Sequence, residues 1–309
     1  MSSYDFSGTT PERHRAYSAA NSAMALPTFF IIGAPKAGTT SLHNYLSEHP
    51  QVQMSSVKEP NFFAPHLDPV NEPRRVGSLD QYEQLFDPTT AVRGEASTPY
   101  SEYPLRQGVP ERIHECVPEA KFVYMVRDPV ERTISHFNHL VATQGERRSL
   151  EEALGDLSDP RNPSICASLY GLQLDLYLRQ FPEDRFLVVD QADLLADREA
   201  TLRRIFAFLG VDEGFVSPRF EEEFLRGSDH HTYPPWFAKF VELHVIPRLR
   251  WLPPGVRRTM RHSVERTLFP AHEASKPDNG MRERLQEYFA DEAARLRELT
   301  GERFASWSV

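Results

Sequence analysis

The chain has 309 residues, of which 40% are hydrophobic and 26% are charged, and its formal net charge at pH 7 is −9. This composition excludes a disordered protein and argues against nucleic acid as the main partner, because long polyanions are held by basic surfaces. The two cysteines, Cys116 and Cys166, lie far apart in the chain. They therefore exclude a cysteine-based zinc site and predict no disulfide framework.

Residues 1–26 lack the basic start and the continuous apolar core of a secretory signal, so we expect a mobile polar tail there. The sequence contains no run of about 18 apolar residues, the length that a transmembrane helix needs. We therefore predict a cytoplasmic protein with a single domain over residues 27–309.

Strands and helices are predicted to alternate along the chain. A buried strand at 28–33 leads into a helix that begins at Thr39 or Thr40 and ends before Pro50. The further expected elements are a helix at 79–86, strands at 91–98 and 120–126, helices at 130–142, 149–154 and 165–180, a strand at 185–190, and helices at 199–210 and 282–299. This alternation predicts an α/β fold of the P-loop type, with a mainly parallel β-sheet and helices on both faces.

The segment "GAPKAGTTS" at 33–41 joins the first strand to the first helix. Unpaired amides at a helix N-terminus make such a turn an anion site, and Lys36 adds a full positive charge. A nucleoside-triphosphate loop has its lysine directly after the second glycine, whereas here Thr39 follows Gly38. A sulfuryl group carries one negative charge, so a single lysine with backbone amides could support its transfer without a metal.

The stretch "PKAGTTSL" resembles the 5′-phosphosulfate loop of sulfotransferases that use 3′-phosphoadenylyl sulfate (PAPS). The resemblance implies that Lys36 contacts the bridging oxygen and stabilises charge on the leaving 5′-phosphate. It also implies that the loop cradles the phosphosulfate through Ala37, Gly38, Thr39 and Thr40. Independently of the resemblance, Ser41 adds a further hydroxyl donor to this loop.

A second predicted anion site follows the strand at 120–126. The sequence there matches every fixed position of the family's 3′-phosphate signature, R-[DN]-P-x-x-R-x-x-S, at Arg127, Asp128, Pro129, Arg132 and Ser135. A doubly charged phosphate favours an arginine fork with a hydroxyl donor, and the resemblance gives these roles to Arg127 and Ser135. Residues 270–307 are similar to a C-terminal pattern common in bacterial members, which implies that Lys276 lies in a loop that closes over PAPS.

The expected general base is Glu59. The segment "VKEPNFF" resembles the K-E-P-x-F-F stretch of the heparan-type branch of the family, which contains the catalytic glutamate. The alternative is a solvated carboxylate paired with Lys58. His136 and His139 are weaker candidates, because histidines on a helix more often pack or lie at the surface.

The acceptor is not predicted beyond its class. "GEASTPYSEY" resembles a family segment that lines the acceptor site, but Ala96 and Ser97 stand where the heparan enzymes carry a lysine, which argues against a sulfated glycan. Residues 215–275 are dense in proline, aromatic residues and arginine, and we expect a mostly helical insertion that serves as a lid or binds the acceptor. Membrane contact through 236–266 is a less favoured alternative.

We therefore predict transfer of the sulfuryl group from PAPS to a hydroxyl, less favourably an amine, of a small-molecule, glycoside or lipid acceptor, with release of the 3′,5′-bisphosphate (PAP) and no metal. The alternative is a P-loop small-molecule kinase using ATP and Mg²⁺, since Asp190 ends the strand "FLVVD" as a magnesium ligand would. A third hypothesis is a non-catalytic nucleotide-binding protein.

Overall fold

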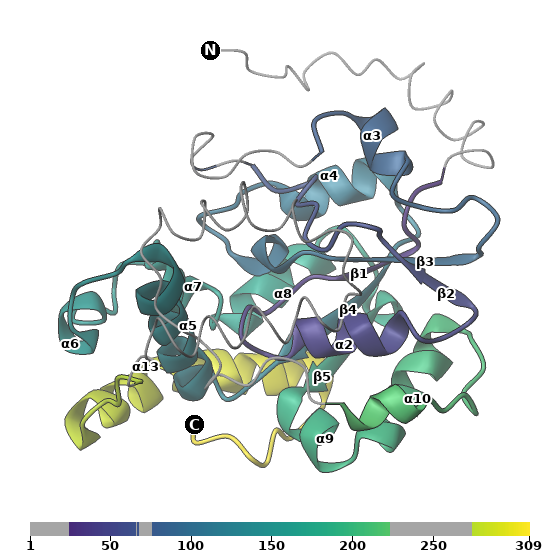
Figure 1. Cartoon of the computed structure of the whole chain (residues 1–309). Helices are drawn as coiled ribbons and strands as arrows, with labels where there is room; N and C mark the ends of the chain where they lie inside the picture. Colours follow the sequence, from purple (N-terminus) through teal and green to yellow (C-terminus); the bar gives the residue numbers. More distant parts are fainter. Residues whose placement is uncertain (1–24, 66, 68–75, 223–273) are drawn as a thin grey trace, which may run out of the picture.

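The computed structural model describes residues 25–65, 67, 76–222 and 274–309 (Figure 1). The predicted N-terminal tail, except its last two residues, lies outside this part of the chain. So does most of the predicted insertion at 215–275. Within the described residues, no helix is both long enough and apolar enough to cross a bilayer.

A five-stranded parallel β-sheet forms the centre of the described structure, with the strand order β2-β3-β1-β4-β5. All three residues of the central strand β1 are fully buried, as the apolar run that encodes it requires. The strands are β1 (Phe29–Ile31), β2 (Val52–Met54), β3 (Val92–Ala96), β4 (Lys121–Val126) and β5 (Phe186–Asp190).

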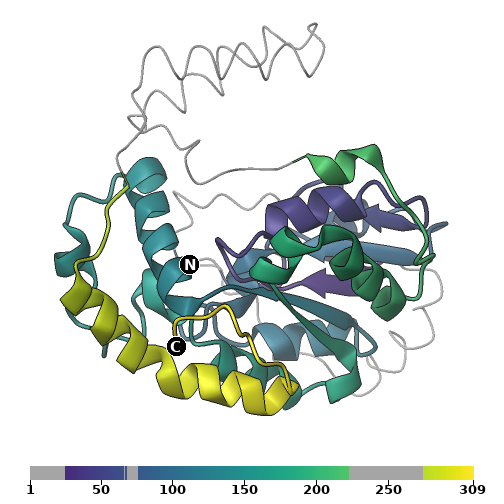
Figure 2. The ribbon, with the colours of Figure 1, turned by 90° about the horizontal axis from the view of Figure 1, so that it is seen from below.

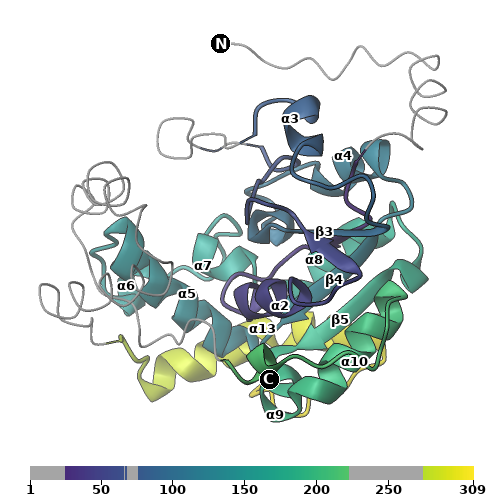
Figure 3. The same cartoon turned by 45° about the vertical axis from the view of Figure 1, so that its right-hand side comes forward.

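Helices cover both faces of this sheet, which confirms the predicted fold class. Figure 2 shows α2 and α10 on one face and α8 and α13 on the other, and Figure 3 shows α5 extending beyond the sheet toward α6 and α7. The helices are α2 (Thr39–Leu46), α3 (Leu79–Glu83), α4 (Val109–Cys116), α5 (Pro129–Gln144), α6 (Leu150–Ala153), α7 (Pro163–Cys166), α8 (Tyr170–Leu178), α9 (Gln191–Ala196), α10 (Arg198–Leu209) and α13 (Asn279–Thr300), with 3₁₀ turns at Thr98–Ser101, Glu183–Arg185 and Pro218–Glu221.

The register of the strands brings three important loops to one edge of the sheet. Ile31 of β1 is paired with Ala96 of β3 on one side and with Val123 of β4 on the other. Because the strands are parallel, the chain leaves β1, β3 and β4 at the same edge. This edge is where ligands bind in open α/β sheets, near a change in strand order.

Four parts of the element prediction were wrong. The short strand β2 and the helices α4 and α9 were not predicted, and the single helix expected at 165–180 is two helices, α7 and α8. The break between them has a physical reason, because the hydroxyl of Ser168 donates to the carbonyl of Pro129 at 3.1 Å and accepts from the buried guanidinium of Arg132. A continuous helix would remove these contacts.

Candidate anion-binding and transfer site

The loop after β1 is held tightly against β4. Ala34 N donates to Met125 O at 2.6 Å, and Met125 N donates to Gly33 O at 2.9 Å. Gly33 has a φ of 143°, and a Cβ atom there would lie 2.0 Å from the hydroxyl of Ser101. Only glycine fits this close approach, so the turn has a fixed shape.

The same loop ends on the N-terminus of α2. Gly38, with a φ of 94°, is the N-cap residue and has no side chain to satisfy the first amides of the helix. Thr39 is buried, and Thr40 and Ser41 are partly exposed. These backbone amides and hydroxyls therefore form a donor set suited to an anion.

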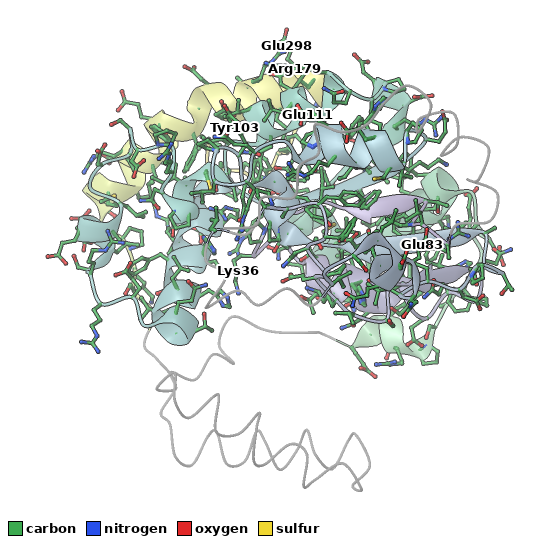
Figure 4. The ribbon with its side chains drawn as sticks, turned by 90° about the horizontal axis from the view of Figure 1, so that it is seen from above. Lys36, Glu83, Tyr103, Glu111, Arg179 and Glu298 are labelled. Carbon is green, nitrogen blue, oxygen red and sulfur yellow. The ribbon has the colours of Figure 1, made fainter. Side chains whose placement is uncertain are left out.

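Lys36 lies between these two parts of the loop. It has a φ of 71°, a left-handed conformation that is disfavoured for a side-chain-bearing residue. Burial, followed by the nearby charge of Arg127, lowers the pKa of Lys36 from 10.5 to about 8. Figure 4 shows Lys36 on the side of the molecule opposite Glu298 of α13. A strained, partly buried cation beside a second cation indicates a site built for a bound anion.

Arg127 joins the two predicted anion sites. One guanidinium nitrogen of Arg127 donates to the carbonyl of Lys36 at 3.4 Å, and another lies 4.0 Å from the carboxylate of Glu131. The Tyr170 hydroxyl donates to Arg127 O at 2.8 Å and accepts from Arg127 N at 3.4 Å. Tyr170 is buried, and its hydroxyl fixes the backbone of Arg127.

Asp128 and Arg132 give the second site its rigidity. Asp128 caps α5 by accepting from Val130 N at 2.9 Å, and its other carboxylate oxygen accepts from Ser308 N. Arg132 is fully buried, and its guanidinium donates to the carbonyl of Pro35 at 3.5 Å. The motif arginine therefore ties α5 to the loop that carries Lys36 and is not exposed to a ligand.

The helix α5 carries Ser135 and also holds the segment that contains Lys276. Ser135 lies two turns into the helix, and Asn138, one turn further along the same side, exchanges two hydrogen bonds with the backbone of Ser275 at 2.8 and 3.1 Å. This pair brings the segment before α13 alongside α5. Lys276 follows directly and is exposed, so it lies near the side of α5 that carries Ser135.

Glu59 lies at the same sheet edge as the anion loop. Its backbone N–H donates to Ala96 O at 3.0 Å, and its φ of 55° is left-handed. The Glu59 carboxylate, with 36% of the side chain exposed, accepts from Lys58 at 2.9 Å and from the hydroxyl of Thr98 at 3.3 Å. Sequence reasoning did not single out Thr98, although it lies in the quoted "GEASTPYSEY" segment.

Burial lowers the pKa of two histidines near the site. The pKa of His43 on α2 is lowered by burial and then by the charge of Lys58. Burial lowers the pKa of His136 well below 6.5, and its ring lies 6.4 Å from that of His139. A buried imidazole with so low a pKa is a weak proton acceptor.

Asp190, the candidate magnesium ligand of the kinase alternative, accepts hydrogen bonds from three donors of the protein itself. Its carboxylate accepts from the indole of Trp307 at 2.9 Å, from Ser306 at 3.2 Å and from Ala192 N at 3.0 Å. Among the described residues, there is also no group of three or more His, Cys, Asp or Glu side chains that could hold a metal ion.

A small cavity elsewhere is not a nucleotide site. Its volume is about 50 Å³, and its lining includes Tyr103, Glu111 and Tyr177. Figure 4 shows Tyr103 and Glu111 well separated from Lys36. A space of this volume accommodates a few water molecules at most.

Comparisons with known proteins agree with this geometry. The model of the sulfotransferase family matches residues 27–107 and 104–214. A solved sulfotransferase from Alicyclobacillus acidocaldarius is 27% identical, with a TM-score of 0.63, and the match covers 92% of this chain and all of that one.

Curated relatives match a shorter part of the chain. Heparan sulfate glucosamine 3-O-sulfotransferase 3B1 of Mus musculus is 30% identical over 194 residues, which is 60% of this chain and 46% of the relative. Bifunctional heparan sulfate N-deacetylase/N-sulfotransferase 2 of Homo sapiens is 28% identical over 202 residues, which is 60% of this chain and 22% of the relative. The matched part thus spans half or less of these two relatives.

Proposed function

The chain belongs to the sulfotransferase family, as its motifs predict, and we propose that it transfers the sulfuryl group of PAPS to an acceptor hydroxyl and releases PAP. The observation that carries this proposal is the closeness of two cations: the charge of Arg127 lowers the pKa of Lys36, and the Arg127 guanidinium donates to the Lys36 carbonyl at 3.4 Å. Two cations from loops after neighbouring strands repel one another there, and a bound phosphate or phosphosulfate would relieve that repulsion. PAPS carries such anions at both its 5′ and 3′ positions.

Each residue has a distinct role in the proposed mechanism. Lys36 and the amides of Gly38, Thr39 and Thr40 hold the phosphosulfate and stabilise the negative charge that develops on the leaving 5′-phosphate. Ala37 and Ser41 complete the loop, while Arg127, Ser135 and Lys276 bind the 3′-phosphate side of the nucleotide. Glu59 accepts the proton of the acceptor hydroxyl while the oxygen of that hydroxyl forms its bond to sulfur.

The proposed acceptor is a hydroxyl of a small molecule, a glycoside or a lipid, with an amine less favoured. Support comes from Ala96 and Ser97, which are buried and uncharged beside the Glu59 loop and provide no cation for a sulfated glycan. The kinase alternative is disfavoured, because Asp190 is enclosed by Trp307 and Ser306. Cytoplasmic location is likewise a proposal.

A transfer assay tests this function directly. Purified protein is incubated with ³⁵S-labelled PAPS, excess EDTA and a panel of alcohols, phenols, sugars, lipids and amines. We expect label to pass to at least one hydroxyl compound and PAP to accumulate in equal amount. Transfer that EDTA abolishes, or ³²P transfer from ATP in place of sulfuryl transfer, would reject the proposal.

Arg127→Ala is expected to raise the KM for PAPS about 10-fold to 100-fold and to change kcat by less than about threefold, because a charge-assisted contact to the 3′-phosphate is made in ground and transition states alike. Steady-state kinetics at saturating acceptor give both constants. Arg147→Ala, which truncates an exposed arginine, is the matched control and should change neither constant. Equal KM values for the wild type and Arg127→Ala would contradict the assignment.

The affinity for PAP should fall as the pH rises above about 8. Binding of an anion favours protonated Lys36 and raises its pKa in the complex, so affinity is constant below the free-enzyme pKa of about 8 and decreases above it. Calorimetric titrations with PAP from pH 7 to 9.5 measure this change. In the Lys36→Arg variant the guanidinium stays charged, so its profile should be flat over this range. A flat wild-type profile would show that Lys36 does not contact the ligand.

A further inference from the structure

A second glutamate, Glu95, is fully buried near the end of β3, beneath the loop that carries Glu59. Its carboxylate accepts from the hydroxyl of Ser97 at 2.5 Å and from the hydroxyl of Tyr82, and the hydroxyl of Tyr100 lies close to it. Burial raises the pKa of Glu95 to about 7, and the three hydroxyl groups oppose that rise. Two hydroxyl donors and a third hydroxyl nearby thus surround a buried carboxyl group that an apolar residue could replace if only packing were needed.

Two of these hydroxyls also hold the Glu59 loop. The hydroxyl of Ser97 accepts from Asn61 N at 3.2 Å, and the hydroxyl of Tyr100 accepts from Phe63 N at 3.1 Å. Because the Ser97 hydroxyl has one hydrogen to donate, its bond to Glu95 leaves its lone pairs directed at the amide of Asn61. Glu95 therefore fixes the orientation of the Ser97 acceptor, and it lies beside the Tyr100 acceptor.

The loop needs such support. Glu59 has a φ of 55° and Asn61 a φ of 54°, and both flank Pro60. Left-handed conformations of side-chain-bearing residues persist only where surrounding contacts determine them. Here the contacts are the bonds from Asn61 and Phe63 to the two hydroxyls, together with the bond from Glu59 N to Ala96 O.

We propose that Glu95 is a positioning residue for the general base: through its bond to the Ser97 hydroxyl, and with the Tyr100 hydroxyl beside it, Glu95 holds the strained loop 59–63, and so the Glu59 carboxylate, in the geometry that transfer requires. This proposal rests on the proposed function of Glu59. Its structural part, the control of the loop by Glu95, is independent of any activity. Glu95 itself has no contact with substrate in this role.

Glu95→Gln tests the proposal, because the NH₂ group of glutamine donates hydrogen bonds where a carboxylate oxygen accepted them. A hydroxyl that faces this NH₂ group must then accept from it and no longer donates to residue 95. We expect the exchange of the Asn61 and Phe63 amides with deuterated water to be about tenfold faster than in the wild type. We also expect kcat to fall about tenfold, with the KM for PAPS changed by less than about twofold. Tyr82→Phe removes one donor only and should give a smaller change of the same kind if Glu95→Gln folds poorly.

Tyr177→Phe is the matched control. It removes a buried hydroxyl that donates to the carbonyl of Tyr100 at 3.0 Å but has no bond to Glu95, so it should leave both amides protected. Exchange in Glu95→Gln no faster than in Tyr177→Phe would overturn the proposal, as would an unchanged kcat despite faster exchange. If the protein showed no sulfuryl transfer at all, the proposed function would fail while the exchange data still decided the role of Glu95 in the loop.

Discussion

Lys36→Ala is expected to lower kcat by about 10²-fold to 10³-fold, since in the proposed mechanism it removes from a partly buried site the charge that stabilises the leaving phosphate. The loop amides would remain, so binding of PAP should weaken less than turnover. Lys36→Arg keeps the positive charge but replaces the compact ammonium with a planar guanidinium, so its kcat should lie between those of Lys36→Ala and the wild type. Steady-state kinetics with labelled PAPS at pH 7 give the kcat of the wild type and of both variants.

The stability of Lys36→Ala separates a catalytic loss from a folding defect. The pKa of Lys36 is about 8 in the folded protein against 10.5 ordinarily, so the unfolded chain binds more protons between these values. The wild type therefore gains stability as pH rises from about 8 to 10.5, and the variant lacks this gain. At pH 7, where charged Lys36 is unfavourable in the fold, the Tm of the variant should be no lower than that of the wild type.

If Lys36→Ala retained more than about a tenth of the wild-type kcat, the proposed role of Lys36 in stabilising the leaving phosphate would be contradicted.

Glu59→Gln is expected to lower kcat by about 10²-fold to 10⁴-fold, because glutamine keeps the shape of the side chain but does not accept the acceptor's proton at neutral pH. The affinity for PAP, measured by calorimetry, should stay within about twofold of the wild-type value, since the loop at 33–41 is unchanged. The kcat should decrease to the same extent with every acceptor that the protein uses.

A matched glutamate elsewhere serves as the control for Glu59. Glu298 lies on α13, on the side of the molecule opposite Lys36 (Figure 4), and Glu298→Gln should leave kcat unchanged. Full activity of Glu59→Gln would instead support the simpler interpretation, in which Glu59 is a loop carboxylate paired with Lys58. Burial lowers the pKa of His136 well below its ordinary value, so His136 is not expected to replace Glu59 as the base.

The sequence predicted those parts of the site that depend on local patterns. A buried strand followed by glycine, lysine and hydroxyl residues is a local signal, and the parallel sheet then brings Lys36 and Arg127 together, since β1 and β4 are neighbours. The family resemblance added the expected roles of Glu59 and Ser135. The short strand β2 was missed because three residues carry too little periodicity to be recognised.

Contacts between residues far apart in the chain could not be predicted from the sequence. The hydrogen bond from Trp307 to Asp190 joins residues 117 positions apart, and no local pattern distinguishes a bonded Asp190 from a free carboxylate at a strand end. The left-handed conformation of Glu59 likewise depends on Ala96 and the 3₁₀ turn that follows. Glu95 was visible as a charged residue in an otherwise strand-like segment, but its partners Tyr82 and Tyr100 were not.

The most direct test of the central claim is equilibrium binding, which needs no knowledge of the acceptor. Calorimetric titrations in EDTA should show that PAP binds at least about tenfold more tightly than ATP, and that adding Mg²⁺ does not reverse the order. This result is expected because the proposed site presents Lys36 and Arg127 to two separate anionic groups, while Asp190 is enclosed by Trp307. Tighter binding of ATP with Mg²⁺ than of PAP would contradict it.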